Sequence, residues 1–113
     1  MLDDIASLTL QTAIAGLGQR QRVTANNIAN SETPGFTASN VDFENALASA
    51  VAAGRPADAA IGVAPTSDPA EVNGNNVSLD KEFVTATKTT LQEQLLTGTL
   101  TAKFNWLSTV LKG

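Results

Sequence analysis

The side chains that could support catalysis in this chain are mainly carboxylates, because the sequence has no histidine and no cysteine. Six of the eleven Asp and Glu residues form three close pairs, which are Asp3 and Asp4, Asp42 and Glu44, and Asp80 and Glu82. Residues one or two positions apart do not share a helix face, so these pairs make poor acid–base dyads. Without imidazole or thiol groups, we expect no catalytic residue, no metal site and no cofactor. The sequence therefore argues against an enzyme.

Two other kinds of binding site also find no support. Segment 68–80 superficially resembles a calcium-binding loop, but Ala70 and Val72 occupy the third and fifth positions, where oxygen ligands are needed. The formal net charge is −4 and the seven Lys and Arg residues are scattered, so no basic surface for phosphate groups is expected. We expect neither a nucleic-acid partner nor a small-molecule substrate.

The most unusual polar cluster is the segment ANNIANSETPGF, residues 25–36. Three asparagines crowd the end of a helical pattern, namely Asn26, Asn27 and Asn30. Asparagine competes for helix backbone groups, so it favours helix ends, and Asn30 suits a left-handed cap. Pro34 and Gly35 suit the centre of a type II turn. Local chemistry predicts a helix stop followed by a turn.

Two long helices should position this cluster. From about residue 7 to residue 29 a heptad-like seam runs through Leu10, Ile14, Leu17, Gln21, Thr24 and Ile28. Gly16 and Gly18 weaken this helix by about 1 kcal/mol each and leave room for a neighbouring backbone. A second helix is expected over 78–112, with Ser78 as its cap. Its apolar face holds Leu79, Phe83, Leu91, Leu95, Leu96, Leu100, Phe104, Leu107 and Leu111.

The middle segment has weaker signals. Residues 41–54 predict a short helix capped by Asn40 or Asp42, with Phe43, Leu47 and Val51 along one face. Residues 55–77 hold three prolines and no sustained period, which predicts an irregular loop with a turn or hairpin at Asn73 and Gly74.

The predicted fold is all-α, with elongated N- and C-terminal helices that pair as a coiled-coil-like bundle and an irregular middle segment containing a short helix. A helix of about 30 residues is roughly 45 Å long. A compact chain of 113 residues has a radius of gyration of roughly 13 Å and therefore a diameter of roughly 34 Å, which is shorter than this helix. We expect one elongated domain over 1–113, divided into 1–30, 31–77 and 78–112. Such a helix pair buries too little to be robust alone, so its core should be completed by other chains.

The N-terminal sequence and the apolar runs bear on localisation. The chain begins Met1-Leu2-Asp3-Asp4, and Asp3 and Asp4 make this stretch acidic where a cleaved signal peptide would be basic. No apolar run approaches the roughly 18 residues needed to span a bilayer. If the chain leaves the cytosol, we expect a route that uses no cleaved signal peptide.

The asparagine segment also resembles a known signature. It is similar to the motif of the bacterial flagellar rod and hook proteins, which is Asn-Asn-Ile-Ala-Asn, two variable residues and then Thr-Pro-Gly-Phe or Thr-Pro-Gly-Tyr. All its fixed positions match here: Asn26, Asn27, Ile28, Ala29, Asn30, Thr33, Pro34, Gly35 and Phe36. The middle segment is too short for the β-domain that longer members insert. The segments ASNVDFENAL, NGNNVSLDKEF and LLTGTLTAKFNWLSTVL make the chain most similar to the small proximal rod proteins of the bacterial flagellar basal body.

This resemblance implies a structural subunit of the proximal rod, which assembles through its terminal helices into the axial tube that transmits torque. It implies export without a cleaved signal peptide to the basal-body rod in the cell envelope. Implied partners are other rod subunits and the basal-body adapter, the MS ring or the export gate, and we expect self-association. The expected assembly interface is Leu10, Ile14, Leu17, Ile28, Leu91, Leu95, Leu100, Phe104 and Leu107.

A different function class also fits an exposed apolar seam. The chain could be a stand-alone helical adaptor that binds the amphipathic helix of a partner protein. Recovery of one soluble partner without axial assembly would favour the adaptor.

Overall fold

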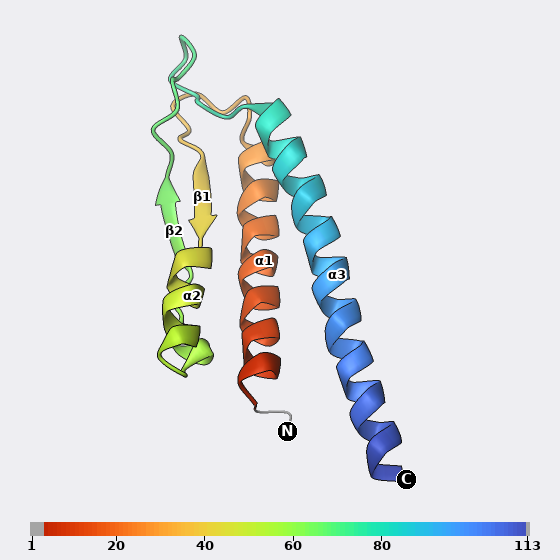
Figure 1. Ribbon diagram of the computed structural model, residues 1–113. Helices are drawn as coiled ribbons and strands as arrows, with labels where there is room; N and C mark the ends of the chain where they lie inside the picture. The colour runs from red at the N-terminus through yellow and green to blue at the C-terminus, as the bar shows by residue number, and fades with distance from the viewer. Residues whose placement is uncertain (1–3, 113) are drawn as a thin grey trace.

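The computed structural model describes residues 4–112. The elements are α1 (Ile5–Ala29), β1 (Ser39–Asp42), α2 (Glu44–Ala52), the short 3₁₀ helix η1 (Pro56–Asp58), β2 (Gly62–Pro65) and α3 (Leu79–Lys112). Figure 1 shows α1 between α3 on one side and the β1–β2 hairpin with α2 on the other. The predicted pairing of two long terminal helices is confirmed.

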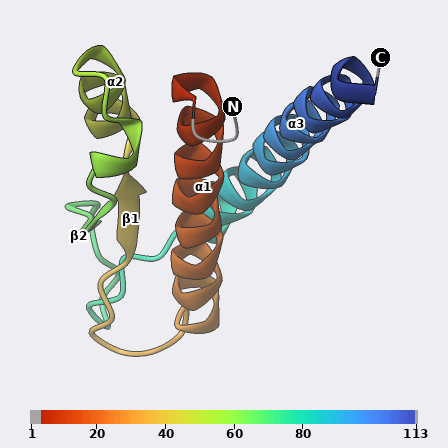
Figure 2. The ribbon, with the colours of Figure 1, turned by 90° about the horizontal axis from the view of Figure 1, so that it is seen from below.

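The molecule is elongated, as the helix lengths predicted. Its extents are 65 × 26 × 14 Å and its radius of gyration is 17.4 Å, well above the roughly 13 Å of a compact chain of this length. Seen from below, α3 diverges from α1 towards its C-terminus (Figure 2). The backbones of the two helices are therefore closest near the start of α3.

Helix α1 begins earlier than the pattern indicated and ends where it was expected. The backbone N–H of Ser7 donates to the Asp4 carboxylate at 2.7 Å, so Asp4 is the N-cap. Asn30 is the C-cap, but its φ of −104° shows that the predicted left-handed conformation is wrong. The N–H of Asn30 donates to the carbonyls of Asn26 and Asn27 in the last turn, so the helix ends without a left-handed residue at this position. The first three residues of the predicted segment 1–30 lie outside the described residues.

The turn after α1 agrees with the prediction. Phe36 N–H donates to the Thr33 carbonyl at 3.2 Å, and Gly35 has a φ of +73°. A positive φ at the third position is what a type II turn requires. The segment Thr33–Phe36 therefore reverses the chain and leads it back along α1.

The middle segment corrects the all-α prediction. Val41 and Asp42, predicted to start a helix, lie in β1, which pairs antiparallel with β2 so that Val41 faces Val63. Residues 62–65, predicted as irregular loop, form β2. Val41 is buried while its neighbours Asn40 and Asp42 are exposed. A strand of this length gives too few alternations to be distinguished from the start of a helix.

Helix α2 begins after the strand, so the predicted caps are also wrong. Phe43 holds the N-cap position without a side-chain cap bond, because Asn40 and Asp42 belong to β1. Leu47 and Val51 do lie on one half-buried face of α2. Pro56–Asp58, also expected as loop, forms η1 beneath the end of α2.

The start of α3 and the turn before it follow the prediction. The Ser78 hydroxyl accepts a hydrogen bond from Lys81 N–H at 3.4 Å, which makes Ser78 the cap. Gly74 has a φ of +85°, and its N–H donates to the Glu71 carbonyl at 2.8 Å. Glu71 N–H in turn donates to the Asn75 carbonyl at 2.7 Å, which closes the predicted turn at 73–74.

The buried core is small and lies between α1, β1 and α2. Among residues 4–112 its centre is formed by Leu17, Val41 and Phe43, which are at most 5% exposed. The ring of Phe43 lies against Gly16, where an added Cβ would be 2.7 Å from the ring carbons. Gly16 was expected to admit a neighbouring backbone, but it admits this aromatic side chain. Gly18 has only the guanidinium of Arg22 nearby, at 3.7 Å.

Arg20 covers the outer side of this core. Its guanidinium lies 4.9 Å from the centre of the Phe43 ring and donates to the Val41 carbonyl at 2.7 Å. It also forms an ion pair with Glu44 at 2.6 Å. The hydrogen bond from Arg20 lowers the pKa of Glu44 despite partial burial. Arg20 thereby joins α1 to the junction of β1 and α2 and shields the ring.

The contact between Gly16 and Phe43 yields a stability prediction. Gly16→Ala is expected to lower the free energy of unfolding by up to about 2 kcal/mol, because overpacking costs about 1–3 kcal/mol and exceeds the helix-propensity gain of about 1 kcal/mol. Gly18→Ala is the matched control and should raise stability, since its Cβ meets no close neighbour. Urea unfolding of both variants measures the difference, and equal effects would contradict the close contact.

Candidate functional site

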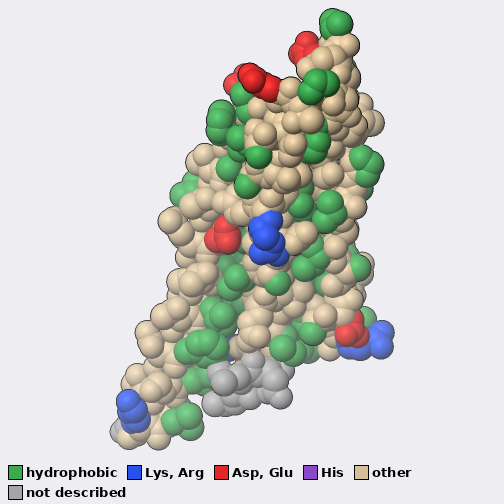
Figure 3. Space-filling model, turned by 180° about the vertical axis from the view of Figure 1, so that it is seen from behind, with side chains coloured by type: hydrophobic (Ala, Val, Ile, Leu, Met, Phe, Trp, Pro, Cys, Tyr) green, Lys and Arg blue, Asp and Glu red, His purple; other side chains and the backbone are tan. Residues whose placement is uncertain are grey.

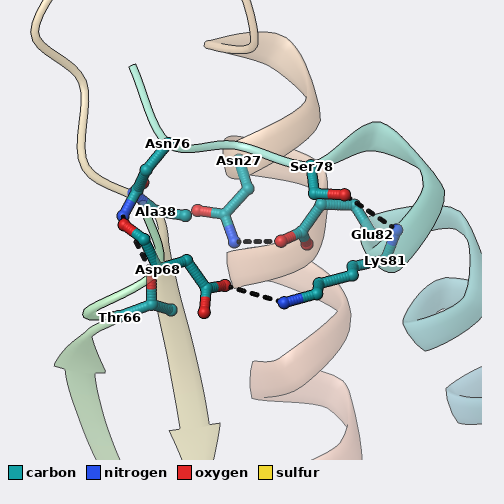
Figure 4. A network of polar contacts seen from close by, with 8 residues as sticks. All are labelled: Asn27, Ala38, Thr66, Asp68, Asn76, Ser78, Lys81 and Glu82. Carbon is teal, nitrogen blue, oxygen red and sulfur yellow. Dashed lines mark hydrogen bonds and ion pairs between the residues drawn. The ribbon is translucent and has the colours of Figure 1, made fainter. Parts of the chain in front are cut away.

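Asn27 joins three elements at the end of α1. Its side chain is 1% exposed. The amide nitrogen donates to the Ser39 carbonyl at 2.7 Å and to the Glu82 carboxylate at 3.2 Å, and the amide oxygen accepts from Ser39 N–H at 3.1 Å. Figure 4 shows the bond between Asn27 and Glu82, which links α1 to α3. One amide thus holds the start of β1 and the first turn of α3 on α1.

Asn75 makes a second connection from the loop before α3. It is 2% exposed, and its amide nitrogen donates to the carbonyls of Asn30 and Thr33, both at 2.8 Å. Its amide oxygen accepts from Val77 N–H at 2.8 Å. Asn75 therefore adds a side-chain donor to two carbonyls that also accept backbone N–H groups, and it fixes the entry to α3 against the exit from α1.

Asn76 makes a third connection, to the strands. Its amide oxygen accepts from Ala38 N–H at 2.7 Å, and its nitrogen donates to the Thr66 hydroxyl at 3.0 Å and the Asp68 carbonyl at 3.2 Å. Asp68 also pairs with Lys81 of α3 at 3.2 Å (Figure 4). We call Asn27, Asn75 and Asn76 with their bonded partners the asparagine junction.

The other two asparagines of the signature segment are more exposed. Asn30 donates from its amide nitrogen to the Asn26 carbonyl at 2.9 Å and accepts from the Thr33 hydroxyl at 3.1 Å. Asn26 is exposed, and its side-chain oxygen accepts a long bond of 3.3 Å from Asn30. Within this segment, Asn27 is committed to this chain whereas the side chain of Asn26 remains accessible to a neighbour.

Glu82 is the titratable group at the centre of the junction. Its partial burial raises its pKa, the hydrogen bond from Asn27 opposes this, and the nearby charge of Asp68 adds to the increase. Within residues 4–112, no cluster of three or more potential ligands from His, Cys, Asp and Glu could hold a metal ion. The junction is suited to fixing the relative position of helices and strands.

A polar clasp joins the other end of the two helices. Lys103 of α3 forms an ion pair with Asp4, the N-cap of α1, at 3.0 Å. The backbone hydrogen bond from Ser7, then the bond from Lys103, lower the pKa of Asp4 from its ordinary 3.8 to about 2. Between the clasp and the junction, Gln21 donates to the Ala86 carbonyl and the Thr90 hydroxyl. Polar contacts therefore occur at both ends and in the middle of the α1–α3 pairing.

The clasp predicts an acid-sensitive stability term. A carboxyl with a lowered folded pKa stabilises the protein above its unfolded pKa, and this contribution is lost as the pH falls through the folded pKa. Asp4→Asn keeps a capping acceptor but removes the charge. Wild type should therefore be more stable than Asp4→Asn at pH 6, and the gap should close between pH about 4 and about 2. Urea unfolding against pH measures this, and a gap independent of pH would contradict it.

Much of α3 is apolar and exposed. Its exposed large side chains are Leu79, Phe83, Val84, Leu91, Leu95, Phe104, Trp106, Val110 and Leu111. Leu91 is 61% and Leu95 69% exposed. From behind, hydrophobic side chains are spread over this face, including the lower part of α3 (Figure 3). So many exposed large apolar side chains on one helix indicate an interaction surface.

The structure separates the predicted interface residues into three groups. Leu91, Leu95 and Phe104 are exposed, whereas Leu10, Ile14, Ile28, Leu100 and Leu107 are half-buried. Leu17 is 2% exposed and belongs to the core of this chain. Leu17 therefore packs mainly within this chain.

An apolar groove lies beside the core. Its volume is about 600 Å³, α1 contributes Ala13 and Leu17, and α2 and α3 add the remaining sides. Leu47 and Val51 come from α2 and Leu95 from α3. Figure 2 shows α1 between α2 and α3 at this level. We call this the α1–α2–α3 groove.

Known proteins match this chain over nearly its full length. The family described as flagella basal body rod protein matches residues 8–37. The flagellar basal body rod protein FlgB of Bacillus subtilis is 32% identical over 92% of this chain and 91% of its own length. FlgB of Escherichia coli is 30% identical over 99% and 98%, and FlgB of Salmonella typhimurium 28% over 100% and 99%. The chain belongs to the FlgB family of flagellar basal body rod proteins.

Membership in the FlgB family confirms the resemblance drawn from the asparagine segment, which lies within the matched residues 8–37. The family supports a structural role and not an enzymatic one. Within residues 4–112, no helix is both long and apolar enough to cross a membrane.

Sequence reasoning missed the partners in the asparagine junction. Asn75, Asn76 and Glu82 were not among the predicted site residues, because their bonds span large sequence separations such as the 55 residues between Asn27 and Glu82. The consecutive asparagines at 75 and 76 were a usable signal. They stand just before the predicted cap of α3, as Asn26 and Asn27 stand just before the end of α1.

Proposed function

We propose that this FlgB-family chain is a structural subunit of the proximal rod of the flagellar basal body. Its terminal helices assemble with neighbouring subunits into the axial tube that transmits torque. The exposed apolar face of α3 is the observation that carries this proposal, since a protein that acted alone would leave this face in water. The near full-length similarity to FlgB proteins supports it.

The proposed assembly interface combines both helices. Leu91, Leu95 and Phe104 are directly available on α3, and half-buried residues extend the surface. These flanking residues are Leu10, Ile14, Ile28, Leu100 and Leu107. The partners would be other rod subunits and further copies of this chain, with the basal-body adapter, the MS ring or the export gate at the base.

The asparagine junction would have a supporting role in the rod. It fixes the first turn of α3 on the last turns of α1, so the two helices enter an assembly as one unit. On this view residues 1–113 act as one rod-type domain, which is exported without a cleaved signal peptide and located in the rod within the cell envelope.

Genetic complementation tests the proposal. Deleting the gene for this chain should abolish rods and motility, and the wild-type chain should restore both. Leu91→Asp with Leu95→Asp places charges on the exposed face and should block rod formation. Thr97→Asp is a matched control on an exposed position of the same helix. Intact rods without the chain, or full rescue by the Leu91→Asp, Leu95→Asp variant, would contradict the proposal.

The adaptor alternative has one observation in its favour, the α1–α2–α3 groove, because helix-binding proteins use apolar grooves of this kind. Crosslinking in cells separates the two functions. Recovery of axial proteins supports the rod subunit, whereas recovery of one soluble partner and no axial protein supports the adaptor.

A further inference from the structure

Helix α3 extends past the start of α1. Lys103 is paired with Asp4, which directly precedes α1. Residues 104–112 therefore extend beyond the N-terminus of α1, as Figure 1 shows at the C-terminus of α3. At 1.5 Å per residue they continue the helix by roughly 13 Å. We call them the α3 overhang.

The overhang carries an apolar stripe with regular spacing. Phe104, Leu107 and Leu111 occupy positions i, i+3 and i+7, which lie on one helix face. The same face of α3 contacts α1 in the part of the helix that precedes the overhang. There Leu96 packs on the core and Lys103 forms the clasp with Asp4. Phe104 is 36% and Leu111 76% exposed. The spacing is that of anchor residues that insert into an apolar groove.

The α1–α2–α3 groove matches this stripe in chemistry and length. Glu44 is the charged residue in its lining, and Arg20 already neutralises it. The α1 part of the groove runs from Thr9 to Leu17, a rise of roughly 12 Å that is close to the length of the overhang. The overhang is also nearly uncharged, with Lys112 at its end. The stripe and the groove therefore match in their apolar chemistry and in length.

The overhang cannot fill the groove of its own chain. Leu95 and Leu96 of α3 form part of the groove, and the overhang begins eight positions after Leu96 on the same continuous helix. We propose that the overhang of one copy docks in the α1–α2–α3 groove of a second copy, with Phe104, Leu107 and Leu111 inserted. This contact rests on the proposed function as a rod subunit and names the surfaces through which two copies meet.

The contact has a defined symmetry. Donor and acceptor are different surfaces of the chain, so the interface is heterologous, and repetition gives a ring or an open helical array. Two helical turns in one groove bury less than the roughly 1,000 Å² that a stable interface needs at the least. The contact is therefore weak in dilute solution and gains strength from neighbouring contacts in an assembly.

Cysteine crosslinking tests the contact, since the chain has no cysteine of its own. One chain carries Ala48→Cys, at an exposed residue that lines the groove, and a larger tagged chain carries Ser108→Cys, at the edge of the anchor stripe. Ser49→Cys, outside the groove lining, and Thr109→Cys, on the opposite face of the overhang, are the matched controls. At high protein concentration, the 48–108 disulfide should form at least fivefold more than the 48–109 or 49–108 disulfide.

Leu107→Asp in the Ser108→Cys chain should reduce the 48–108 disulfide at least fivefold, and circular dichroism checks that this variant keeps its helix content. Equal yields for all cysteine pairs, or unchanged yield with Leu107→Asp, would overturn the proposal. The same cysteine pair in cells separates it from the proposed function. Rods built from the Ala48→Cys and Ser108→Cys chains without a 48–108 disulfide would refute the contact alone, whereas failure of the wild-type chain to restore rods would refute the proposed function alone.

Discussion

Asn27→Ala is expected to lower the free energy of unfolding by about 2–4 kcal/mol. The variant removes the amide that bonds both backbone groups of Ser39 and the carboxylate of Glu82. A buried polar group left without a partner costs about 1–3 kcal/mol. The loss should fall on the attachment of β1 and of the first turn of α3, so amide hydrogens near residue 82 should exchange faster.

Asn26→Ala is the matched control for this prediction. Asn26 is an exposed neighbour in the same helical turn, and its side chain accepts one long bond. The change should alter stability by no more than about 0.5 kcal/mol. Urea unfolding followed by circular dichroism measures both variants. Equal destabilisation by the two changes would contradict the role of Asn27 in joining α1 to β1 and α3. The asparagines would then act only by ending the helix.

Phe43→Ala is expected to cost about 3–5 kcal/mol, as for other large buried aromatic residues. Phe43 is 4% exposed and contacts Gly16 on α1 while Arg20 covers its ring. The loss approaches the whole stability of a small domain. We therefore expect the variant to lose its cooperative urea transition, with α2 and the β1–β2 hairpin released from α1. Leu47→Ala, at the edge of the core, should cost less.

A double-mutant cycle isolates the contact behind this effect. Gly16→Ala should destabilise the wild-type chain, but with Phe43→Leu the smaller side chain leaves room for the new methyl group. In that background Gly16→Ala should be neutral or stabilising by up to about 1 kcal/mol, the gain in helix propensity. The sign of its effect should therefore change. The same destabilisation in both backgrounds would show that the ring is not what the methyl group meets.

The long helices could be predicted because their signals are local. Apolar residues repeat along α1 and α3, Ser78 caps one helix, and a proline and a glycine follow the other within a few residues. Their lengths then required an elongated shape, which the 65 Å extent confirms. The start of α1 was less certain because its cap, Asp4, depends on a contact with Ser7 that the apolar pattern does not record.

The hairpin and the asparagine junction depend on long-range contacts. Val41 faces Val63 across 22 positions of sequence, and each strand has only four residues. The Asn27 amide can form the same hydrogen bonds with Glu82 or with a neighbouring subunit, so the sequence alone could not choose between these partners. The structure assigns Asn27 to this chain and leaves Asn26 exposed.

The central claim is that neighbouring subunits complete the apolar face of α3. Hydrogen exchange of residues 91–111, measured in the isolated chain and in purified basal bodies, tests it most directly. In the isolated chain we expect the fastest exchange at 104–111, beyond the Lys103–Asp4 ion pair, and slower exchange at 79–90, where the junction and Gln21 hold α3. In basal bodies we expect strong protection throughout α3. Equal protection of residues 91–111 in both states would contradict the claim.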